Sequence, residues 1–138
     1  MTTSTTSLAD RVLDAYEAST FDLAVFTPDA TGRHNFDAEG ADLSIAVGME
    51  TMQAIRAVIP DLRFADRCTY RDPGGTAIAQ YMIRGTLPEG SALAIPGCMV
   101  MRADGDRVAH VLEYLDPAAL APIIAAIESA ADVSGGTR

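Results

Sequence analysis

Lysine is absent from this sequence. All ten positively charged side chains are arginines, and with nineteen carboxylates the formal net charge is -9. Without lysine there can be no Schiff base on a lysine amine, no phosphate-loop lysine and no lysine general base. The acidic balance argues against nucleic acid and against a membrane surface as partners, because both attract clustered positive charge.

Cysteine and long hydrophobic runs are also scarce. Cys68 and Cys98 form no Cys-x-x-Cys pattern, so we expect no zinc site. The longest apolar stretch, residues 118–127, is too short to span a bilayer and contains Pro122. Residues 1–7 are polar and lack the segments of a signal peptide. These features predict a soluble, cytoplasmic protein.

The chain still has enough apolar residues for one core, since 49% of its 138 residues are hydrophobic. We expect one domain over residues 8–131, between a flexible N-terminus (1–7) and a flexible tail (132–138). Helix signals stand at three places: residues 8–19 after a capping box at Ser7, residues 49–59 before Pro60, and a helix from Asp116-Pro117 that Pro122 splits or kinks.

Beyond Pro60 the hydrophobic period changes from 3.6 to 2, which is typical of strands. Arg63, Arg67 and Arg71 are expected on a solvent face, with the alternate residues Leu62, Phe64, Cys68 and Tyr70 turned inward. Turn signals follow at residues 72–75, 87–90 and 104–106. They predict a four-stranded antiparallel meander over about residues 62–115, after a short strand and loop between residues 29 and 42.

The last two strands, residues 92–101 and 108–115, are largely apolar on both faces. A sheet of that kind must be covered on both sides. The helices can cover one face, and a second subunit or the C-terminal segment would cover the other. We therefore expect a homodimer.

The order of these elements resembles the nuclear transport factor 2-like superfamily, closest to its SnoaL-like branch, over about residues 8–127. Supporting fragments lie in matching order: Pro28-Asp29-Ala30-Thr31 before His34, Pro60-Asp61-Leu62-Arg63-Phe64, Gly85-Thr86-Leu87-Pro88, and Asp104-Gly105-Asp106 before Glu113-Tyr114-Leu115-Asp116. The resemblance implies an α+β fold: a cone-like curved antiparallel sheet, made of the meander plus a short first strand, packed against N-terminal helices, with a C-terminal helix. It also implies a pocket inside the cone and a dimer interface outside it.

Glu113 is the most informative acid. It shares a strand face with Ala109, Val111 and Leu115, and a carboxylate among aliphatic neighbours is costly unless it is paired or protonated. The position resembles one that this fold directs into its pocket. The alternative is a structural ion pair with an arginine such as Arg84.

His34 and Tyr16 occupy positions that resemble functional sites of ketosteroid isomerases. His34 stands where those enzymes place a general-base aspartate, and histidine can act as a base near neutral pH. Tyr16 stands at the place of their oxyanion tyrosine, although Gly97 replaces their second acid. A loop histidine and a core tyrosine are the structural alternatives; Asn35 and Asp37 are interpreted as ordinary loop residues.

Four more residues are candidates for substrate binding: Tyr81, Met99, Met101 and Leu115. Tyr81 and Arg84 face opposite sides of the strand over residues 77–86, and we favour Tyr81 as the inward one, although a bulge could reverse the faces. The two methionines suit an irregular apolar pocket, with plain core packing as the alternative.

No Gly-x-Gly-x-x-Gly, Ser-His-Asp spacing or metal-ligand cluster is present, so any reaction should need no metal and no cofactor. The sequence therefore favours a cofactor-independent acid–base enzyme on a small apolar substrate, with Glu113 and His34 as a proton-transfer pair. Isomerisation, dehydration, cyclisation and epoxide opening all qualify. The alternative is a ligand-binding or dimerising module of the same fold without turnover.

Overall fold

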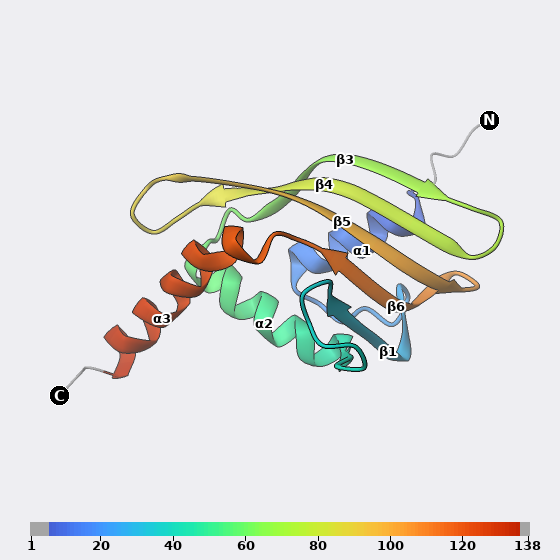
Figure 1. Ribbon diagram of the computed structural model, residues 1–138, viewed down its shortest axis with the longest axis horizontal. Coiled ribbons are helices and arrows are strands. Elements are labelled where there is room, and N and C mark those ends of the chain that lie inside the picture. The colour runs from blue at the N-terminus through green and yellow to red at the C-terminus, as the bar shows by residue number, and fades with distance from the viewer. Residues whose placement is uncertain (1–5, 136–138) are drawn as a thin grey trace.

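Six strands form one curved, open sheet, with two α-helices against its inner face and a third α-helix that packs against the second (Figure 1). The computed structural model describes residues 6–135. The strand order is β2-β1-β6-β5-β4-β3, so strands from both ends of the sequence meet in the middle of the sheet. This is the α+β fold class expected from the sequence. No helix within residues 6–135 combines the length and hydropathy needed to cross a membrane.

The predicted meander is confirmed. It consists of β3 (Arg63–Arg71), β4 (Thr76–Thr86), β5 (Ala92–Asp104) and β6 (Arg107–Tyr114), all paired antiparallel. The expectation of an all-antiparallel sheet was wrong at the other edge, because β1 (Phe26–His34) runs parallel to β6 and then pairs with the two-residue β2 (Leu43–Ser44). Pro28 lies in the part of β1 where the pairing with β6 is irregular, so its lack of a backbone N–H interrupts no regular series of hydrogen bonds.

The helix ends follow their capping residues. Helix α1 (Leu8–Ala18) begins at Ser7, whose hydroxyl accepts a hydrogen bond from the Asp10 backbone N–H. Helix α2 (Ile45–Val58) begins four residues earlier than predicted because Ser44 caps it. Asp116 caps the short 3-10 helix η1 (Pro117–Leu120), which leads into α3 (Ala121–Gly135), so the predicted split falls just before Pro122.

Helix α3 extends three residues past Asp132, where the flexible tail was expected to begin. The predicted flexibility of residues 1–5 and 136–138 lies outside the described residues.

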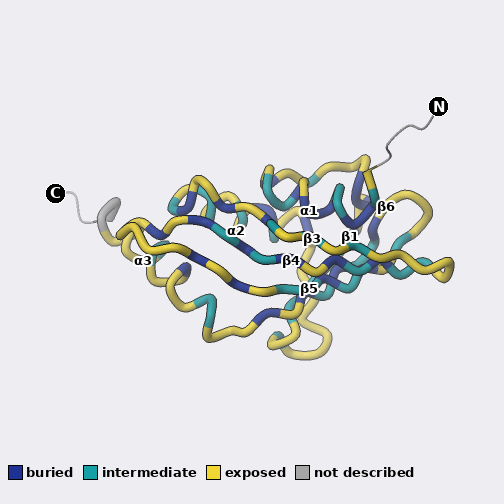
Figure 2. The backbone as a smooth tube through the Cα atoms, turned by 90° about the horizontal axis from the view of Figure 1, so that it is seen from above, coloured by how far each residue is buried: buried dark blue, intermediate teal, exposed yellow. Residues whose placement is uncertain are grey.

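Burial alternates along the strands of the meander (Figure 2). The inner residues of β4 and β5, among them Ala77, Ala79, Met99 and Met101, are fully buried beneath the helices. The outer residues form what we call the convex face: Ile78, Met82, Val100, Leu112 and Tyr114. Within residues 6–135 the helices all lie on the opposite side (Figure 1), and these outer side chains are half-buried or exposed.

The predicted alternation of β3 is correct up to Phe64 and then reverses. Two residues of β3 stand opposite one residue of β4 between Ala65 and Cys68, and Asp66 in this bulge has a positive φ of 55°. The extra residue turns Cys68 and Tyr70 outward, although both were expected to point inward. It also turns Arg67 inward, over α1.

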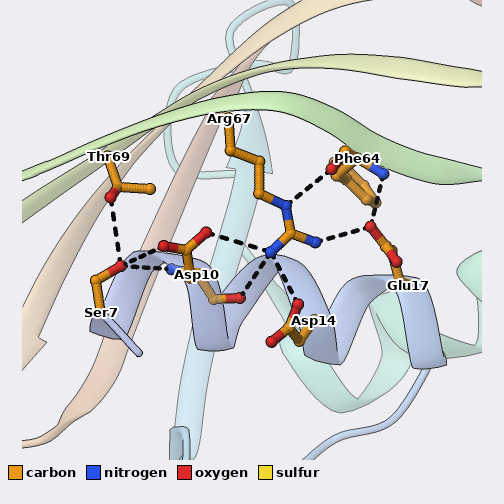
Figure 3. A network of polar contacts seen from close by, with 7 residues as sticks. All are labelled: Ser7, Asp10, Asp14, Glu17, Phe64, Arg67 and Thr69. Atoms are coloured by element: carbon orange, nitrogen blue, oxygen red, sulfur yellow. Dashed lines mark hydrogen bonds and ion pairs between the residues drawn. The ribbon is translucent and has the colours of Figure 1, made fainter. Parts of the chain in front are cut away.

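Arg67 links the bulge to helix α1 (Figure 3). Its guanidinium lies 3.2 Å from Asp10, 2.8 Å from Asp14 and 2.7 Å from Glu17. The Glu17 carboxylate also accepts a hydrogen bond of 2.8 Å from the Phe64 backbone N–H. The predicted solvent-facing arginine therefore ties the first helix to the sheet.

Candidate active site

A cavity of about 280 Å³ lies between the inner face of the sheet, helix α2 and helix α3. Most of its lining is apolar: Met52, Ile55, Leu62, Phe64, Ile83, Val111, Leu115, Leu120, Ile123, Ile124 and Ile127 contribute. The polar and charged side chains in the lining include Tyr16, His34, Asp37 and Glu113. The cavity thus combines hydrocarbon walls with one titratable cluster.

Glu113 lies in this cavity because of the parity of β6. Its neighbours on the same face, Val111 and Leu115, are buried, and Glu113 itself is only 8% exposed. The structural alternative of an ion pair with Arg84 is wrong, because Arg84 points outward and pairs with Asp66 at 3.0 Å. The partners of Glu113 are instead His34 and Tyr81.

His34 meets Glu113 through the parallel pairing of β1 and β6, in which the two residues are register partners. The His34 Nε2 atom lies 3.3 Å from Glu113 Oε1. Hydrogen bonding to Glu113 raises the pKa of His34 above its ordinary value, and the Asp37 carboxylate adds to this effect while partial burial opposes it. The contacts of the folded protein therefore favour the protonated imidazole more than the surroundings of a free histidine do.

Asp37 fixes the other side of His34. One oxygen of its carboxylate accepts the His34 backbone N–H at 2.7 Å and lies 3.4 Å from His34 Nδ1. The imidazole also stacks on Phe36, with ring centroids 4.9 Å apart. Both ring nitrogens of His34 consequently face a carboxylate, which holds Nε2 toward Glu113.

Tyr81, which was predicted to contact substrate, is not among the residues that line the cavity; it contacts Glu113 instead. It points inward as favoured from the sequence, and its hydroxyl donates a hydrogen bond to Glu113 Oε2. Burial and the charge of Glu113 both raise the pKa of Tyr81 above its ordinary value, so the hydroxyl keeps its proton. Gly97 makes room for the ring, since a Cβ there would stand 2.6 Å from Tyr81 Cε1.

Tyr16 projects from α1 into the cavity, between the edges of Phe26 and Phe64. Burial is the main cause that raises its pKa above the ordinary value, and the charge of Glu113 adds to it. Among residues 6–135 the Tyr16 hydroxyl has no hydrogen-bond partner. It can therefore donate to a bound molecule.

The remaining predicted binding residues divide into two groups. Leu115 lines the cavity, as expected. Met99 and Met101, which were also predicted to bind substrate, are fully buried in the core and are not among the residues that line the cavity. They share the inner face with Glu113, but the inner face of β5 lies beneath the packed core rather than the cavity.

Sequence reasoning missed two residues of the loop after β1. Asp37 orients His34, and the Asn35 side chain accepts the Leu115 backbone N–H at 2.9 Å, which fixes the end of β6. The sequence did contain a signal for Asp37, because an aspartate at this position, three residues after His34, can accept a hydrogen bond from the His34 backbone N–H. No comparable signal links Asn35 to a strand eighty positions away.

Comparison with known proteins identifies the architecture through structure rather than sequence. No family model matches this sequence, and no curated protein matches it. A candidate isomerase from Bacillus subtilis superposes with a TM-score of 0.66 at 15% identity, over 86% of this chain and 91% of that one. A candidate SnoaL-like polyketide cyclase from Jannaschia superposes with a TM-score of 0.66 at 13% identity, over 85% of this chain and 88% of that one.

A third similar structure is IdmH, a candidate polyketide cyclase from Streptomyces antibioticus. It gives a TM-score of 0.68 at 17% identity, over 86% of this chain and 96% of that one. The chain has the nuclear transport factor 2-like fold. The likeness to SnoaL-like structures confirms the resemblance seen in the sequence, and at these identities it concerns the fold alone.

The ionisable side chains of the cavity are grouped around His34. Within residues 6–135, no group of three or more His, Cys, Asp or Glu side chains is placed to hold a metal ion. Glu113 and Asp37 instead lie on opposite sides of one imidazole. The chemistry that these residues can supply is proton transfer and hydrogen bonding beside an apolar surface.

Proposed function

We propose that this protein is a cofactor-independent acid–base enzyme acting on a small, mainly apolar substrate. The observation that supports this most directly is the pair of Glu113 and His34, 3.3 Å apart at the edge of a hydrocarbon-lined cavity. A buried carboxylate beside an imidazole of raised pKa is suited to moving a proton between substrate atoms.

Each polar side chain has a distinct part in this proposal. Glu113 exchanges a proton with the substrate, and His34 Nε2, which lies against Glu113, exchanges a proton with that carboxylate. Tyr81 keeps the carboxylate oriented, because its hydroxyl donates to the oxygen that His34 does not contact. Tyr16 donates a hydrogen bond to a substrate oxygen, on which negative charge would develop during the reaction. Isomerisation, dehydration, cyclisation and epoxide opening all fit these roles.

Proton abstraction can be tested without knowledge of the natural substrate. The bicyclic ketone 2-acetylnaphthalene carries exchangeable methyl protons next to its carbonyl, and their replacement in D2O is measurable by NMR. We expect the protein to accelerate this exchange, and Glu113→Gln to reduce the acceleration by roughly 10²–10⁴-fold, the usual contribution of a general base. His34→Gln should cause a comparable loss.

Glu128→Gln is the matched control, because Glu128 lies on the exposed side of α3 and does not line the cavity. Its exchange rate should equal that of the unmodified protein. If the ketone binds but the protein does not accelerate exchange, or if Glu113→Gln leaves the rate unchanged, the catalytic proposal fails. The alternative of a binding module without turnover would then be favoured.

We also propose that two copies associate through the convex face. Its apolar side chains are covered by no helix within residues 6–135, and Tyr114 is 46% exposed. A stable dimer of this kind would bury on the order of 1,000 Å² or more. Light scattering at micromolar concentration should report a dimer, and Leu112→Arg should give a folded monomer. A monomeric unmodified protein would contradict this proposal.

A further inference from the structure

Helix α3 forms one side of the cavity but has few attachments of its own. Among residues 121–132, Ile123 alone is buried, whereas α2 buries Ile45 and Met49 and α1 buries several residues. The helix packs mainly against α2 and against η1, and it leads away from the sheet (Figure 1). An element with few buried contacts opens at a low cost in free energy. Helix α3 is therefore the least firmly held of the three helices.

Two separate spaces border α3. The residues of this helix that line the cavity are Ile123, Ile124 and Ile127. A second space, a groove of about 740 Å³, is lined on α3 by Pro122, Ala125, Ala126, Ser129 and Ala130. Because a helix has about 3.6 residues per turn, these two sets of positions fall on opposite sides of it. The groove thus lies behind the wall that α3 presents to the cavity.

The groove gives α3 room to move. It is bounded by Ala57 and Val58 at the end of α2 and by Leu87, Pro88 and Glu89 in the turn that joins β4 to β5. Most of these side chains are small or apolar, which suits the sliding of one packed element over another. No ion pair holds any of residues 121–132 in place. A shift of α3 toward this turn therefore breaks no ion pair.

The chain just before α3 has the features of a hinge. Helix η1 is a 3-10 helix, whose hydrogen bonds are less well aligned than those of an α-helix, and Pro122 has no backbone N–H to extend them into α3. Asp116 fixes the upstream end, because its carboxylate accepts the Ala118 backbone N–H at 3.0 Å. A movement of α3 about residues 117–122 would leave Glu113 in place on β6.

We infer that α3 is a movable gate of the cavity, which shifts into the groove and so widens the mouth for a molecule to enter or leave. The mouth is marked by the exposed lining residues: Ile124 on α3 is 51% exposed, and Leu43 on β2 is 63% exposed. This inference rests on the proposed function, since it describes how a substrate would reach that site. It concerns access, however, and can be tested without any substrate.

Access to the cavity can be measured with a thiol inside it. Ile83→Cys places one there, because Ile83 on β4 lines the cavity and is only 6% exposed. Cys68 and Cys98 are replaced by serine, so that this background protein has no other thiol among its cysteines. Mass spectrometry then gives the rate at which the uncharged reagent N-phenylmaleimide labels the introduced thiol.

Filling the groove should hold the gate closed. Ala126→Trp adds an indole ring to the groove from α3, and Ala57→Trp adds one from α2; neither position lines the cavity. We expect each variant to slow labelling at least about tenfold, because α3 can no longer move into the filled space. Ala131→Trp is the matched control. Ala131 is exposed on α3 and lines neither space, so the labelling rate should equal that of the background protein.

The outcomes separate this inference from the proposed function. Slower labelling in a folded groove variant, with an unchanged rate in Ala131→Trp, supports the gate, and either groove variant serves if the other does not fold. An unchanged rate in both groove variants, or an equal slowing by Ala131→Trp, overturns the inference even if the protein catalyses proton exchange. The expected slowing, in a protein that catalyses no exchange, leaves the gate in place and refutes the catalytic proposal.

Discussion

Replacement of Tyr81 by phenylalanine tests the polar support of the candidate site. The Tyr81 hydroxyl donates to Glu113, and both residues are buried, with exposed fractions of 5% and 8%. A hydrogen bond to a charged group contributes about 1.5–3 kcal/mol, and its loss leaves a buried carboxylate with one donor fewer. The ring keeps its edge-to-face contact with Phe64, at a centroid distance of 5.0 Å. We therefore expect Tyr81→Phe to lower the free energy of unfolding by about 2 kcal/mol at neutral pH.

Urea denaturation followed by circular dichroism measures this loss, and Tyr70→Phe is the matched control. Tyr70 is 54% exposed, so its replacement should change stability by less than about 0.5 kcal/mol. In a double-mutant cycle with Glu113→Gln, the cost of Tyr81→Phe should fall to about 1 kcal/mol, the value for a neutral hydrogen bond. A loss below about 0.5 kcal/mol in the unmodified background would refute the reasoning, because Glu113 would then be held without Tyr81.

Two further predictions concern the residues around this pair. Phe64→Ala should lower the free energy of unfolding by about 3–5 kcal/mol, since the ring is 4% exposed and contacts both Tyr16 and Tyr81; a loss under roughly 1 kcal/mol in chemical denaturation would contradict its packing. The pKa of His34 is higher in the folded than in the unfolded protein. The contribution of its ion pair to the free energy of unfolding is therefore fully present below about pH 6.5 and is lost as the pH rises through the pKa of the folded state. Asp37→Asn should lower the pKa of His34 in an NMR titration, in which His110 serves as the internal control. An unchanged pKa of His34 would contradict this prediction. Because the His34 side chain is 40% exposed, the accompanying change in the free energy of unfolding should stay below about 1 kcal/mol.

The parts of the fold that depend on local signals were predicted well. Ser7 and Asp116 each cap a helix within two or three residues of themselves, and the three turns of the meander need only their own residues to form. Pairings between distant segments gave no such signal. The parallel contact of β1 with β6 joins residues about eighty positions apart, and nothing in the composition of either strand specifies its partner.

The candidate site was partly predictable for the same reason. The alternation of β6 placed Glu113 on the inner face from its own strand alone. The role of His34 came from a resemblance, and its contact with Glu113 depends on the β1–β6 register, which the sequence does not reveal. Met99 and Met101 were assigned to the correct face of β5, but this did not show whether they line the cavity. The inner face of the sheet borders both the packed core and the cavity.

The β3 bulge shows how a change of register can support the site. The two bulged residues stand opposite Tyr81, and Asp66 within the bulge is held by Arg84 at 3.0 Å. The bulge brings Arg67 over α1, where it and Glu17 hold both backbone polar groups of Phe64. Phe64 in turn contacts the rings of Tyr16 and Tyr81. The bulge that broke the predicted period of 2 therefore helps to fix two aromatic side chains: Tyr16, which lines the cavity, and Tyr81, whose hydroxyl donates to Glu113.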